Sequence, residues 1–296
     1  MTPSHERARL RELVAESCLA VPGAPFPLAA RLAAQAGYAA VYLSGAAFSA
    51  AQLALPDIGL FTLTELATET SRIVRASRLP VMVDADTGFG EPVNVERTVV
   101  ELESAGAAAI QLEDQVLPKR CGHLSGKSLV DVDVMVAKLR AAVAARSDPN
   151  LLLLARTDAR AVEGLEAALA RASAYLEAGA DGLFIEALES REEFETVANT
   201  FDVPLVANMT EFGKSPLMTT EELAELGYSI VLFPVTLLRV AMRAMEAALA
   251  VIAEDGTQRP LLDIMQTRQE LYDLLGYSDY QERDRRFFSG ETHHDD

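Results

Sequence analysis

The chain has 296 residues and a formal net charge of -18, with 50% of its residues hydrophobic and 24% charged. This length and composition are typical of a globular protein with one large α/β domain or two smaller ones. A chain this acidic is not expected to bind nucleic acid, because phosphate binding requires a basic face.

The N-terminal segment, residues 1–16, alternates charged residues with Leu and Val and lacks the apolar stretch of a signal peptide. No apolar run in the sequence approaches the length of a membrane span, so no membrane partner is expected. The two cysteines cannot form a disulfide framework and suit a reducing interior. We therefore expect a cytoplasmic protein.

A recurring pattern of helix end, glycine and short apolar run follows along the chain. The glycine suits the left-handed position after a helix, and the apolar run suits a buried parallel strand. The pattern occurs at residues 36–44, 105–113, 178–186 and 226–234. Further strands are expected at residues 18–21, 79–84, 150–156 and 203–208. Helical periodicity lies between them, for example at residues 93–104, 132–145 and 165–177.

About eight strands alternating with helices predict a (β/α)8 TIM-type barrel, because such strands pair in parallel through right-handed crossovers. A doubly wound sheet is the alternative, but no G-x-G-x-x-G turn follows the first strand. We expect one barrel domain over residues 1–296, with the barrel at about 10–255. A C-terminal helix is expected within 256–280, and a disordered tail at 281–296.

Two connections are longer than a minimal loop, and one helix has no strand to cover. The connections are residues 44–62, where Thr62-x-x-Glu65 suits a capping box, and residues 114–130. Long loops in compact barrels are often lids or binding loops. After a long helix at 235–254, a second helix at about 261–275 is expected to pack against another subunit.

The longer loop carries Cys121 between Lys119, Arg120 and His123. Positive charge stabilises a thiolate, so this thiol is expected to ionise more readily than that of a free cysteine. Gly122 would allow a tight turn that brings Cys121 and His123 close to a ligand. The alternative is a solvated basic loop. Cys18 lies among apolar residues of the first strand, and we expect no chemistry from it.

Polar side chains follow the predicted strands, at the end where a barrel of this type carries its active site. Asp84 and Asp86 are two residues apart, so both should point to the same side of an extended strand. Glu113 and Asp114 follow the next strand, and oxygen ligands from neighbouring strands suit Mg²⁺. The alternative is a pair of aspartates in a turn.

Arg156 ends the fifth predicted strand, and a buried arginine there could bind a substrate carboxylate with two hydrogen bonds. The alternative is a structural ion pair with Glu113 or Asp158. Ser44, Glu186 and Asn208 end other strands, so the polar residues converge on one face.

With these residues placed, the chain resembles the isocitrate lyase/phosphoenolpyruvate mutase superfamily and, within it, the methylisocitrate lyases. The most specific motif is KRCGH at residues 119–123, although isocitrate lyases usually have a lysine at position 120. Residues 83–90 and 111–115 match the metal-site strands, and residues 208–213 match the methylisocitrate branch. Phe184 and Pro234 stand where isocitrate lyases tend to have tryptophan and threonine, and could make room for an extra methyl group.

The resemblance implies residue roles and an assembly. Asp84 and Asp86 would hold Mg²⁺, with Mn²⁺ as an alternative, and Glu113 would lie nearby. The implied catalytic residues are Cys121, His123, Glu113, Arg156 and Tyr42. The implied substrate contacts are Ser44, Gly45, Ala46, Asp57, Lys119, Arg120, Gly122, Glu186, Asn208, Met209, Thr210, Arg239 and Arg268. Relatives often have glycine where Ala46 stands, so its N–H can serve only if its φ is negative. The family assembly is a homotetramer that exchanges a C-terminal helix.

The implied reaction is the Mg²⁺-dependent cleavage of 2-methylisocitrate, a tricarboxylate, into pyruvate and succinate in propionate catabolism through the methylcitrate cycle. Cys121 would protonate the carbanion that leaves, and Tyr42, Glu113 or a water molecule would take the hydroxyl proton. Sister activities on the same barrel are the alternatives: isocitrate lyase, 2,3-dimethylmalate lyase and oxaloacetate decarboxylase. A more distant alternative is a non-catalytic protein that binds an acidic metabolite.

Overall fold

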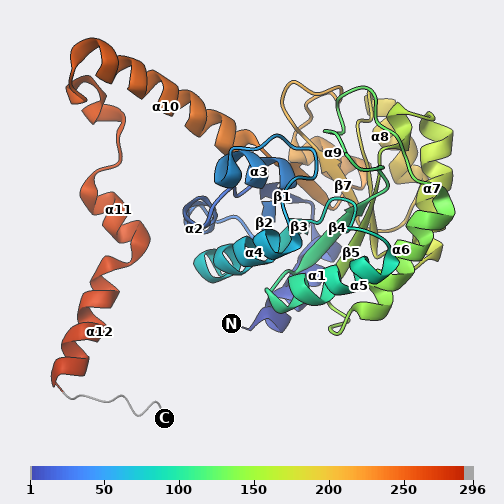
Figure 1. Ribbon diagram of the computed structural model, residues 1–296, viewed down its shortest axis with the longest axis horizontal. Helices are drawn as coiled ribbons and strands as arrows, with labels where there is room; N and C mark the ends of the chain where they lie inside the picture. Colours follow the sequence, from blue (N-terminus) through green and yellow to red (C-terminus); the bar gives the residue numbers. More distant parts are fainter. Residues whose placement is uncertain (1, 290–296) are drawn as a thin grey trace. The chain divides into compact units, whose positions relative to one another are not determined.

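The computed structural model describes residues 2–289, and within them eight parallel strands form one sheet (Figure 1). The strand order is β1-β8-β7-β6-β5-β4-β3-β2. The strands are β1 Leu19–Pro22, β2 Val41–Leu43, β3 Val81–Asp84, β4 Ala109–Glu113, β5 Leu152–Thr157, β6 Gly182–Ile185, β7 Leu205–Asn208 and β8 Ile230–Phe233. The two ends of this order meet where the Ala24 N–H donates to the Tyr42 carbonyl at 2.8 Å. The predicted (β/α)8 TIM-type barrel is confirmed.

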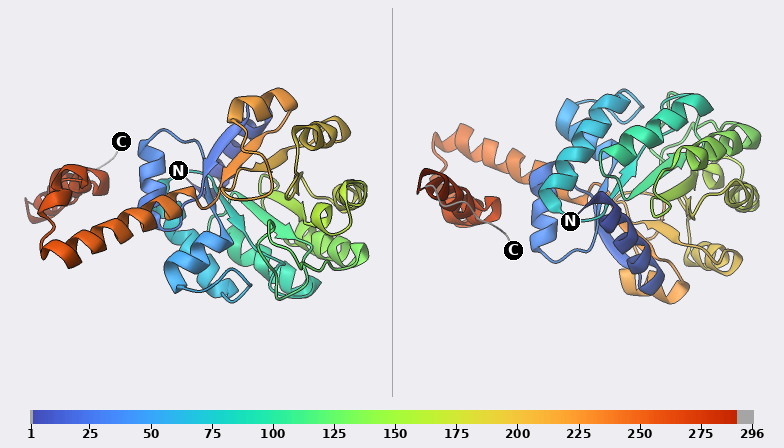
Figure 2. Two further views of the ribbon diagram at one scale, coloured as in Figure 1. Left: turned by 90° about the horizontal axis from the view of Figure 1, so that it is seen from above. Right: turned by 90° about the horizontal axis from the view of Figure 1, so that it is seen from below.

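Helices surround the strands, as the two views of Figure 2 show. In chain order they are α1 Pro3–Glu16, α2 Pro27–Gln35, α3 Gly45–Leu53, α4 Leu63–Ser77, α5 Pro92–Ser104, α6 Val132–Ala145, the 3-10 turn η1 Ala159–Ala161, α7 Leu165–Glu177, α8 Arg191–Thr200 and α9 Thr220–Leu226. The C-terminal part adds α10 Thr236–Asp255, the 3-10 turn η2 Arg259–Ile264, α11 Arg268–Leu275 and α12 Tyr277–Ser289. Across the described residues, we find no helix with the length and apolarity that a bilayer crossing requires.

The local signals that predicted the barrel take the expected conformations. Gly37, Gly106, Gly179 and Gly227 have φ angles of 86°, 98°, 103° and 99°, the left-handed backbone that glycine adopts without steric cost. Thr62 and Glu65 form the expected capping box at the start of α4. Each predicted strand coincides with an observed one to within a few residues.

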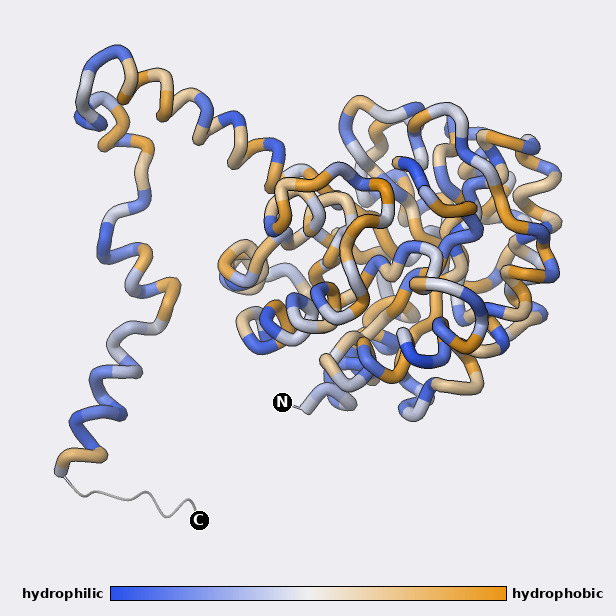
Figure 3. The backbone as a smooth tube through the Cα atoms, in the orientation of Figure 1, coloured by the Kyte–Doolittle hydropathy of each residue, from blue (hydrophilic) through white to orange (hydrophobic). Residues whose placement is uncertain are grey.

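Two layers of apolar side chains position the strand ends. Outward-facing strand residues pack against the helices, with Ile73, Leu102 and Leu139 fully or almost fully buried. The inward-facing residues fill the barrel, and Leu10 and Val14 of α1 pack with them. Figure 3 shows orange, hydrophobic stretches recurring along the tube of the barrel part of the chain. The polar strand ends described below therefore stand on an apolar, close-packed base.

Helix α1 is fastened to the barrel by a buried arginine. The Arg7 Nε–H donates to the Ala107 carbonyl at 2.9 Å, and its Nη1 donates to Asp148 Oδ2 at 3.2 Å. Asp148 also accepts from the Asn150 amide at 2.9 Å. Burial would raise the pKa of Asp148, but the hydrogen bonds from Asn150 and Arg7 outweigh burial and lower this pKa.

The chain divides into two compact units, Met1–Arg239 and Val240–Asp296. The prediction of one domain over the whole chain stays a prediction. Two expectations for the second unit were wrong. The helix expected at 261–275 is interrupted, because Thr267 and Glu270 form a capping box that starts α11 separately. The tail expected to be disordered from residue 281 is helical through Ser289, where ion pairs such as Arg285–Glu282 at 3.2 Å support α12. Residues 290–296 of that tail lie outside the described residues.

Candidate active site

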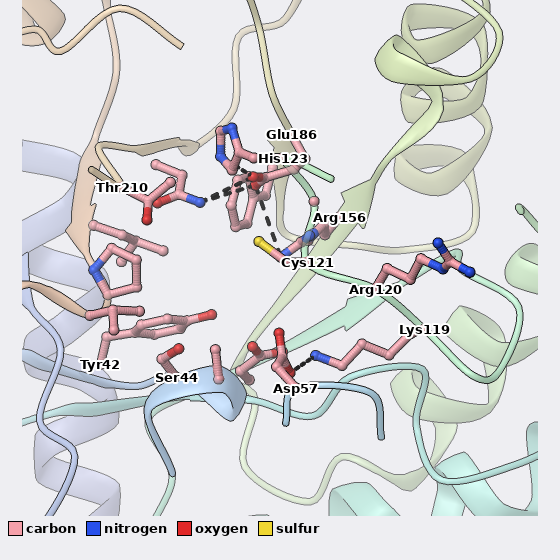
Figure 4. Close-up of a pocket in the computed structure, with 18 residues that line it drawn as sticks. Tyr42, Ser44, Asp57, Lys119, Arg120, Cys121, His123, Arg156, Glu186 and Thr210 are labelled. Atoms are coloured by element: carbon pink, nitrogen blue, oxygen red, sulfur yellow. Dashed lines mark hydrogen bonds and ion pairs between the residues drawn. The ribbon is translucent and has the colours of Figure 1, made fainter. Parts of the chain in front are cut away.

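A small cavity of about 50 Å³ lies at the carboxyl ends of the barrel strands (Figure 4). It is lined by Tyr42, Ser44, Ala46, Asp57, Asp84, Lys119, Arg120, Cys121, Gly122, His123, Arg156, Phe184, Glu186, Asn208, Thr210, Leu232, Pro234 and Val235. These residues come from six strand ends, from the loop between β4 and α6 and, for Asp57, from the loop between α3 and α4. The predicted convergence of polar strand ends on one site is therefore observed.

Asp84 and Asp86 come together, but not for the reason that the sequence suggested. Asp84 ends β3, whereas Asp86 has a φ of 47° and leaves the extended conformation. Asp84 Oδ1 accepts from the Asp86 N–H at 3.2 Å, and Asp84 Oδ2 accepts from the Gly45 N–H at 3.1 Å. Aspartate tolerates left-handed backbone better than most residues do. The turn, and not strand alternation, places the two carboxylates.

The Lys119 ammonium lies against two carboxylates. Its Nζ is 2.8 Å from Asp86 Oδ1 and also contacts Asp57 Oδ1. Burial alone would lower the pKa of Lys119, but the surrounding carboxylates, Asp86 first, outweigh burial and raise this pKa. Burial, only partly offset by Lys119, raises the pKa of Asp86 to about 7. The structure thus gathers more negative charge here than one lysine neutralises.

These acids fit a divalent cation. Asp86 Oδ2 and Glu113 Oε1 are buried and have no hydrogen-bond partner among the described residues. Within the same residues, no three His, Cys, Asp or Glu side chains converge as a complete metal site. Mg²⁺ is commonly held by one or two carboxylates, with water and substrate completing its coordination, so the Asp84–Asp86 pair suits Mg²⁺ better than a metal that needs a full protein cage.

Arg156 is the central cation of the pocket. Its Nε lies 3.0 Å from Asp158 Oδ2 and 3.3 Å from Glu113 Oε2, and its Nη1 lies 3.9 Å from Glu186 Oε2. The guanidinium also lies over the Phe184 ring, 5.1 Å from its centroid. The ion pair that the sequence left as an alternative is therefore present with both expected partners. Contact of Arg156 with a substrate stays a prediction.

The cations around Cys121 are arranged differently from the expectation. Lys119 points to Asp57, and Arg120 points away from the pocket in Figure 4. The Arg120 Nη1 donates to the Ser125 carbonyl at 3.3 Å, within the loop. The positive charges next to Cys121 in sequence thus serve the acid pair and the loop itself. The exposed Cys121 thiol lines the same pocket as Arg156.

His123 joins the loop to two other parts of the site. Its Nδ1 accepts from the Lys214 N–H at 2.9 Å, and its Nε2 lies 2.7 Å from Glu186 Oε1, within ion-pair distance. Asn208 Nδ2 also donates to Glu186 Oε1, at 3.1 Å. Burial would raise the pKa of Glu186, but Arg156 and then His123 outweigh it and lower this pKa. Glu186 is therefore a charged acceptor that fixes His123 and Asn208.

Tyr42 is held as a neutral phenol. Its hydroxyl donates to Gln111 Oε1 at 2.9 Å, and Gln111 Nε2 donates to Asp84 Oδ1 at 3.1 Å. Burial, followed by the charge of Asp84, raises the pKa of Tyr42 well above its usual value. These contacts make Tyr42 a hydrogen-bond donor rather than a base. They also connect it to the acid pair through Gln111.

Two predicted substrate contacts, Met209 and Arg239, do not line the cavity, a third acts through its backbone, and the contact predicted for Arg268 stays a prediction. Met209 is buried in the core, where its sulfur accepts from the Met218 N–H at 3.2 Å. Arg239 pairs with Glu211 Oε2 at 2.6 Å and is not among the described residues that line the cavity. Arg268 begins α11 in the C-terminal unit. Gly45 contributes its N–H to Asp84, and Ala46, whose φ is not positive, lines the cavity as required.

Three residues that the sequence reasoning left without a role support the site. Lys127 pairs with Asp158 at 2.7 Å. Gln115 clamps the loop base, because it donates to the Arg120 carbonyl at 2.8 Å and accepts from the Arg120 N–H at 2.9 Å. Gln111 links Tyr42 to Asp84. Their position in or beside the strand ends was the only available signal, because their partners are distant in sequence.

A family model described as phosphoenolpyruvate phosphomutase matches residues 10–253, and the chain belongs to this family. The predicted superfamily is confirmed. The chain is 57% identical over 276 residues to a 2-methylisocitrate lyase from Aeropyrum pernix, covering 93% of this chain and 89% of the relative.

Solved structures of the same superfamily match over almost the whole chain. A 2,3-dimethylmalate lyase aligns with a TM-score of 0.89 at 37% identity, covering 97% of this chain and 95% of that chain. A phosphonopyruvate hydrolase in complex with oxalate and Mg²⁺ aligns with a TM-score of 0.86 at 31% identity, covering 97% of this chain and 100% of that chain.

Proposed function

We propose that this protein is a carbon–carbon lyase that cleaves 2-methylisocitrate into pyruvate and succinate. The observation that carries the proposal is the convergence of Asp84, Arg156 and the Cys121 loop on one cavity, in a chain 57% identical to a 2-methylisocitrate lyase. The substrate is a small carboxylate, which suits the cationic groups of an otherwise acidic protein.

The proposed metal is Mg²⁺, held by Asp84 and Asp86, with Mn²⁺ as the alternative. When bound, it would polarise the substrate hydroxyl and the adjacent carboxylate. Its addition would also relieve the repulsion between the two buried carboxylates. A solved relative in complex with Mg²⁺ and oxalate supports this assignment.

The proposed chemistry uses charge stabilisation and one proton donor. Cleavage takes the hydroxyl proton, turns the C–O bond into the pyruvate carbonyl and leaves the bonding electrons on the succinate carbon. Arg156, His123 and Asn208 would stabilise the negative charge that develops on that fragment. Cys121 would then donate the proton that completes succinate. Its thiol suits this role because it is exposed and lines the cavity.

We assign the removal of the hydroxyl proton to Glu113 or to a water molecule beside it. Burial raises the pKa of Glu113 well above its usual value, which makes its carboxylate a stronger base. Tyr42 is less suited to this step, because its hydroxyl already donates to Gln111. Its proposed role is to orient Asp84 through Gln111.

Substrate binding requires the loop to move. A cavity of about 50 Å³ has room for a few water molecules, whereas a tricarboxylate has many more atoms. The loop closes the cavity at Gly122, whose position leaves no room for a Cβ beside Glu186. The loop is therefore proposed to open for the substrate and to close over it, which excludes water from the carbanion.

Two residues of the cavity wall support the choice of 2-methylisocitrate over isocitrate. Phe184 and Pro234 both line the cavity, as expected for positions that shape the pocket around the extra methyl group. One methyl group in a hydrophobic pocket changes binding by about 1–3 kcal/mol, so some activity on sister substrates is expected.

The test is a comparison of kcat/KM for 2-methylisocitrate, isocitrate, 2,3-dimethylmalate and oxaloacetate, with and without EDTA. We expect 2-methylisocitrate to be the best substrate and EDTA to abolish its cleavage until excess Mg²⁺ is added. A higher kcat/KM for another substrate would assign the protein to a sister activity. Ligand-dependent stabilisation without any product would indicate a non-catalytic binding protein.

The proposed assembly is a homotetramer in the cytoplasm, with a C-terminal helix exchanged between subunits. Exposed apolar residues support burial of the C-terminal unit in an assembly: Val240 is 65% exposed, Leu249 68% and Ile264 82%. Sedimentation equilibrium of the full chain should give four subunits. A monomer at micromolar concentration would contradict the proposal.

A further inference from the structure

Lys127, in the Cys121 loop, is a buried cation to which the proposed reaction assigns no role. Its side chain is 1% exposed, and its Nζ lies 2.7 Å from Asp158 Oδ1. The same Nζ donates to the Gly122 carbonyl. It is not among the described residues that line the cavity. A buried lysine is unfavourable unless it is paired, so these two contacts hold the loop in one place.

Asp158 is shared between this lysine and the central arginine of the site. It is fully buried, with Oδ2 3.0 Å from Arg156 Nε and Oδ1 3.2 Å from Arg156 Nη2. Its own N–H donates to Asp114 Oδ1 at 3.0 Å, which ties its backbone to the residue that follows β4. Burial would raise the pKa of Asp158, but Arg156 and then Lys127 outweigh it and lower this pKa. Asp158 is thus a charged, immobile anchor.

We propose that Lys127 is a positioning residue that locks the Cys121 loop onto Asp158, the carboxylate that also orients Arg156. This inference rests on the proposed lyase function. Gly122 separates Cys121 from His123, and its carbonyl is bound to Lys127, so the lock fixes the loop next to its reacting thiol. Asp158 would then fix the position of the proton donor Cys121 relative to the cation Arg156.

The lock also defines what must break when the loop opens. Lys127 must separate from Asp158. An unpaired charge in a buried site is unfavourable, so this separation opposes opening of the loop. The two hydrogen bonds from Arg156 to Asp158 involve no loop residue, so we expect Arg156 to remain oriented when the loop opens. Loss of Lys127 should therefore impair the step that needs Cys121 more than it impairs substrate binding.

The first test replaces Lys127 by methionine, which keeps the length of the side chain and removes its charge. We expect kcat to fall by about 100-fold with KM within about threefold, since a small misplacement of a reacting group costs this much. Trypsin should cut after Arg120 at least about tenfold faster than in the wild type, because the loop has lost a buried charge pair. Arg97→Gln, which removes a cation that is 74% exposed on α5, is the control and should change neither readout.

The second test is a double-mutant cycle with Asp158→Asn. This change should raise KM, because it removes the orienter of Arg156. If Lys127 acts through Asp158, adding Lys127→Met to Asp158→Asn should lower kcat by less than about threefold further. Independent, multiplicative effects would overturn the proposal, as would wild-type trypsin resistance in Lys127→Met.

The two readouts separate this inference from the proposed function. Trypsin cleavage requires no substrate, so faster cutting in a protein that lacks lyase activity would refute the reaction and retain the lock. Lyase activity with unchanged cutting and unchanged kcat in Lys127→Met would refute the lock alone. If Asp158→Asn does not fold, as judged by circular dichroism, the trypsin and kinetic results on Lys127→Met decide the question.

Discussion

Replacing Gly122 by alanine should prevent the Cys121 loop from docking. A Cβ at this position would lie 2.4 Å from Glu186 Cγ and 2.5 Å from Arg156 Nη2, where ordinary contacts begin at 3.4 Å. Neither neighbour can move freely, because Asp158 holds the Arg156 guanidinium and the Glu186 contact is with an inner methylene carbon. An outward shift of the loop, against the contacts of Lys127, would relieve this clash.

The size of the effect follows from the cost of overpacking. Adding one methylene to a close-packed site costs about 1–3 kcal/mol. A tenfold change in an equilibrium ratio corresponds to about 1.4 kcal/mol, so the ratio of docked to undocked loop should fall by about 5- to 150-fold. We expect kcat/KM for 2-methylisocitrate to fall within this range. The melting temperature should fall by no more than about 4 °C, because undocking relieves the clash.

The assay measures pyruvate release by coupling it to lactate dehydrogenase, with Mg²⁺ in excess. Ser125→Ala, at an exposed position of the same loop, is the matched control and should retain wild-type kcat/KM. Wild-type kcat/KM in Gly122→Ala would refute the argument that the docked loop is required. A large fall in the melting temperature would show instead that the added methyl group destabilises the barrel.

Three further predictions concern the acid pair, the cysteines and the base of the barrel. Asp86→Asn should lower activity by about 100-fold or more through loss of the metal, and calorimetric titration should show weaker Mg²⁺ binding. It should not lower the melting temperature, because asparagine tolerates the φ of 47° and removes a buried charge. Iodoacetamide at pH 7.5 should label exposed Cys121 and spare Cys18, because burial raises the pKa of Cys18 to about 11; the reverse labelling would contradict this. Asp148→Asn should lower the free energy of unfolding by about 0.5–1 kcal/mol at pH 7, a value reduced for solvent screening. Because the pKa of Asp148 is lowered from 3.8, the difference in the free energy of unfolding between the wild type and Asp148→Asn should be present above pH 3.8 and should disappear as the pH falls below it. Urea titrations at several pH values can check this.

The loop at residues 114–130 illustrates how far sequence reasoning reached and where it stopped. Its length and its KRCGH motif predicted a functional loop, and the structure places Cys121, Gly122 and His123 in the cavity. The motif did not predict which carboxylates its cations bind. Lys119 lies against Asp57 and Asp86, and Arg120 returns to its own loop. Those partners are decided by the closing of the barrel.

For Asp84 and Asp86, the sequence also predicted which residues come together but not how the backbone places them. The D-x-D spacing at Asp84 and Asp86 correctly marked a cluster of carboxylates. The expected mechanism, alternation along a strand, was wrong, because Asp86 takes a left-handed turn. A turn of this kind depends on contacts such as the Asp86 carbonyl accepting the Glu113 N–H at 2.9 Å, which only the neighbouring strand provides.

The sequence by itself determined the alternation of strands and helices and the residues that stand at the strand ends. These features are local, because periodicity, capping residues and glycines act on the backbone within a few residues. The tertiary structure decided the pairing of charges: Lys127 with Asp158, Arg156 with Glu113 and Asp158, and Arg239 with Glu211. Such pairs act over a few ångströms, so they can be assigned only once the barrel has brought distant segments together.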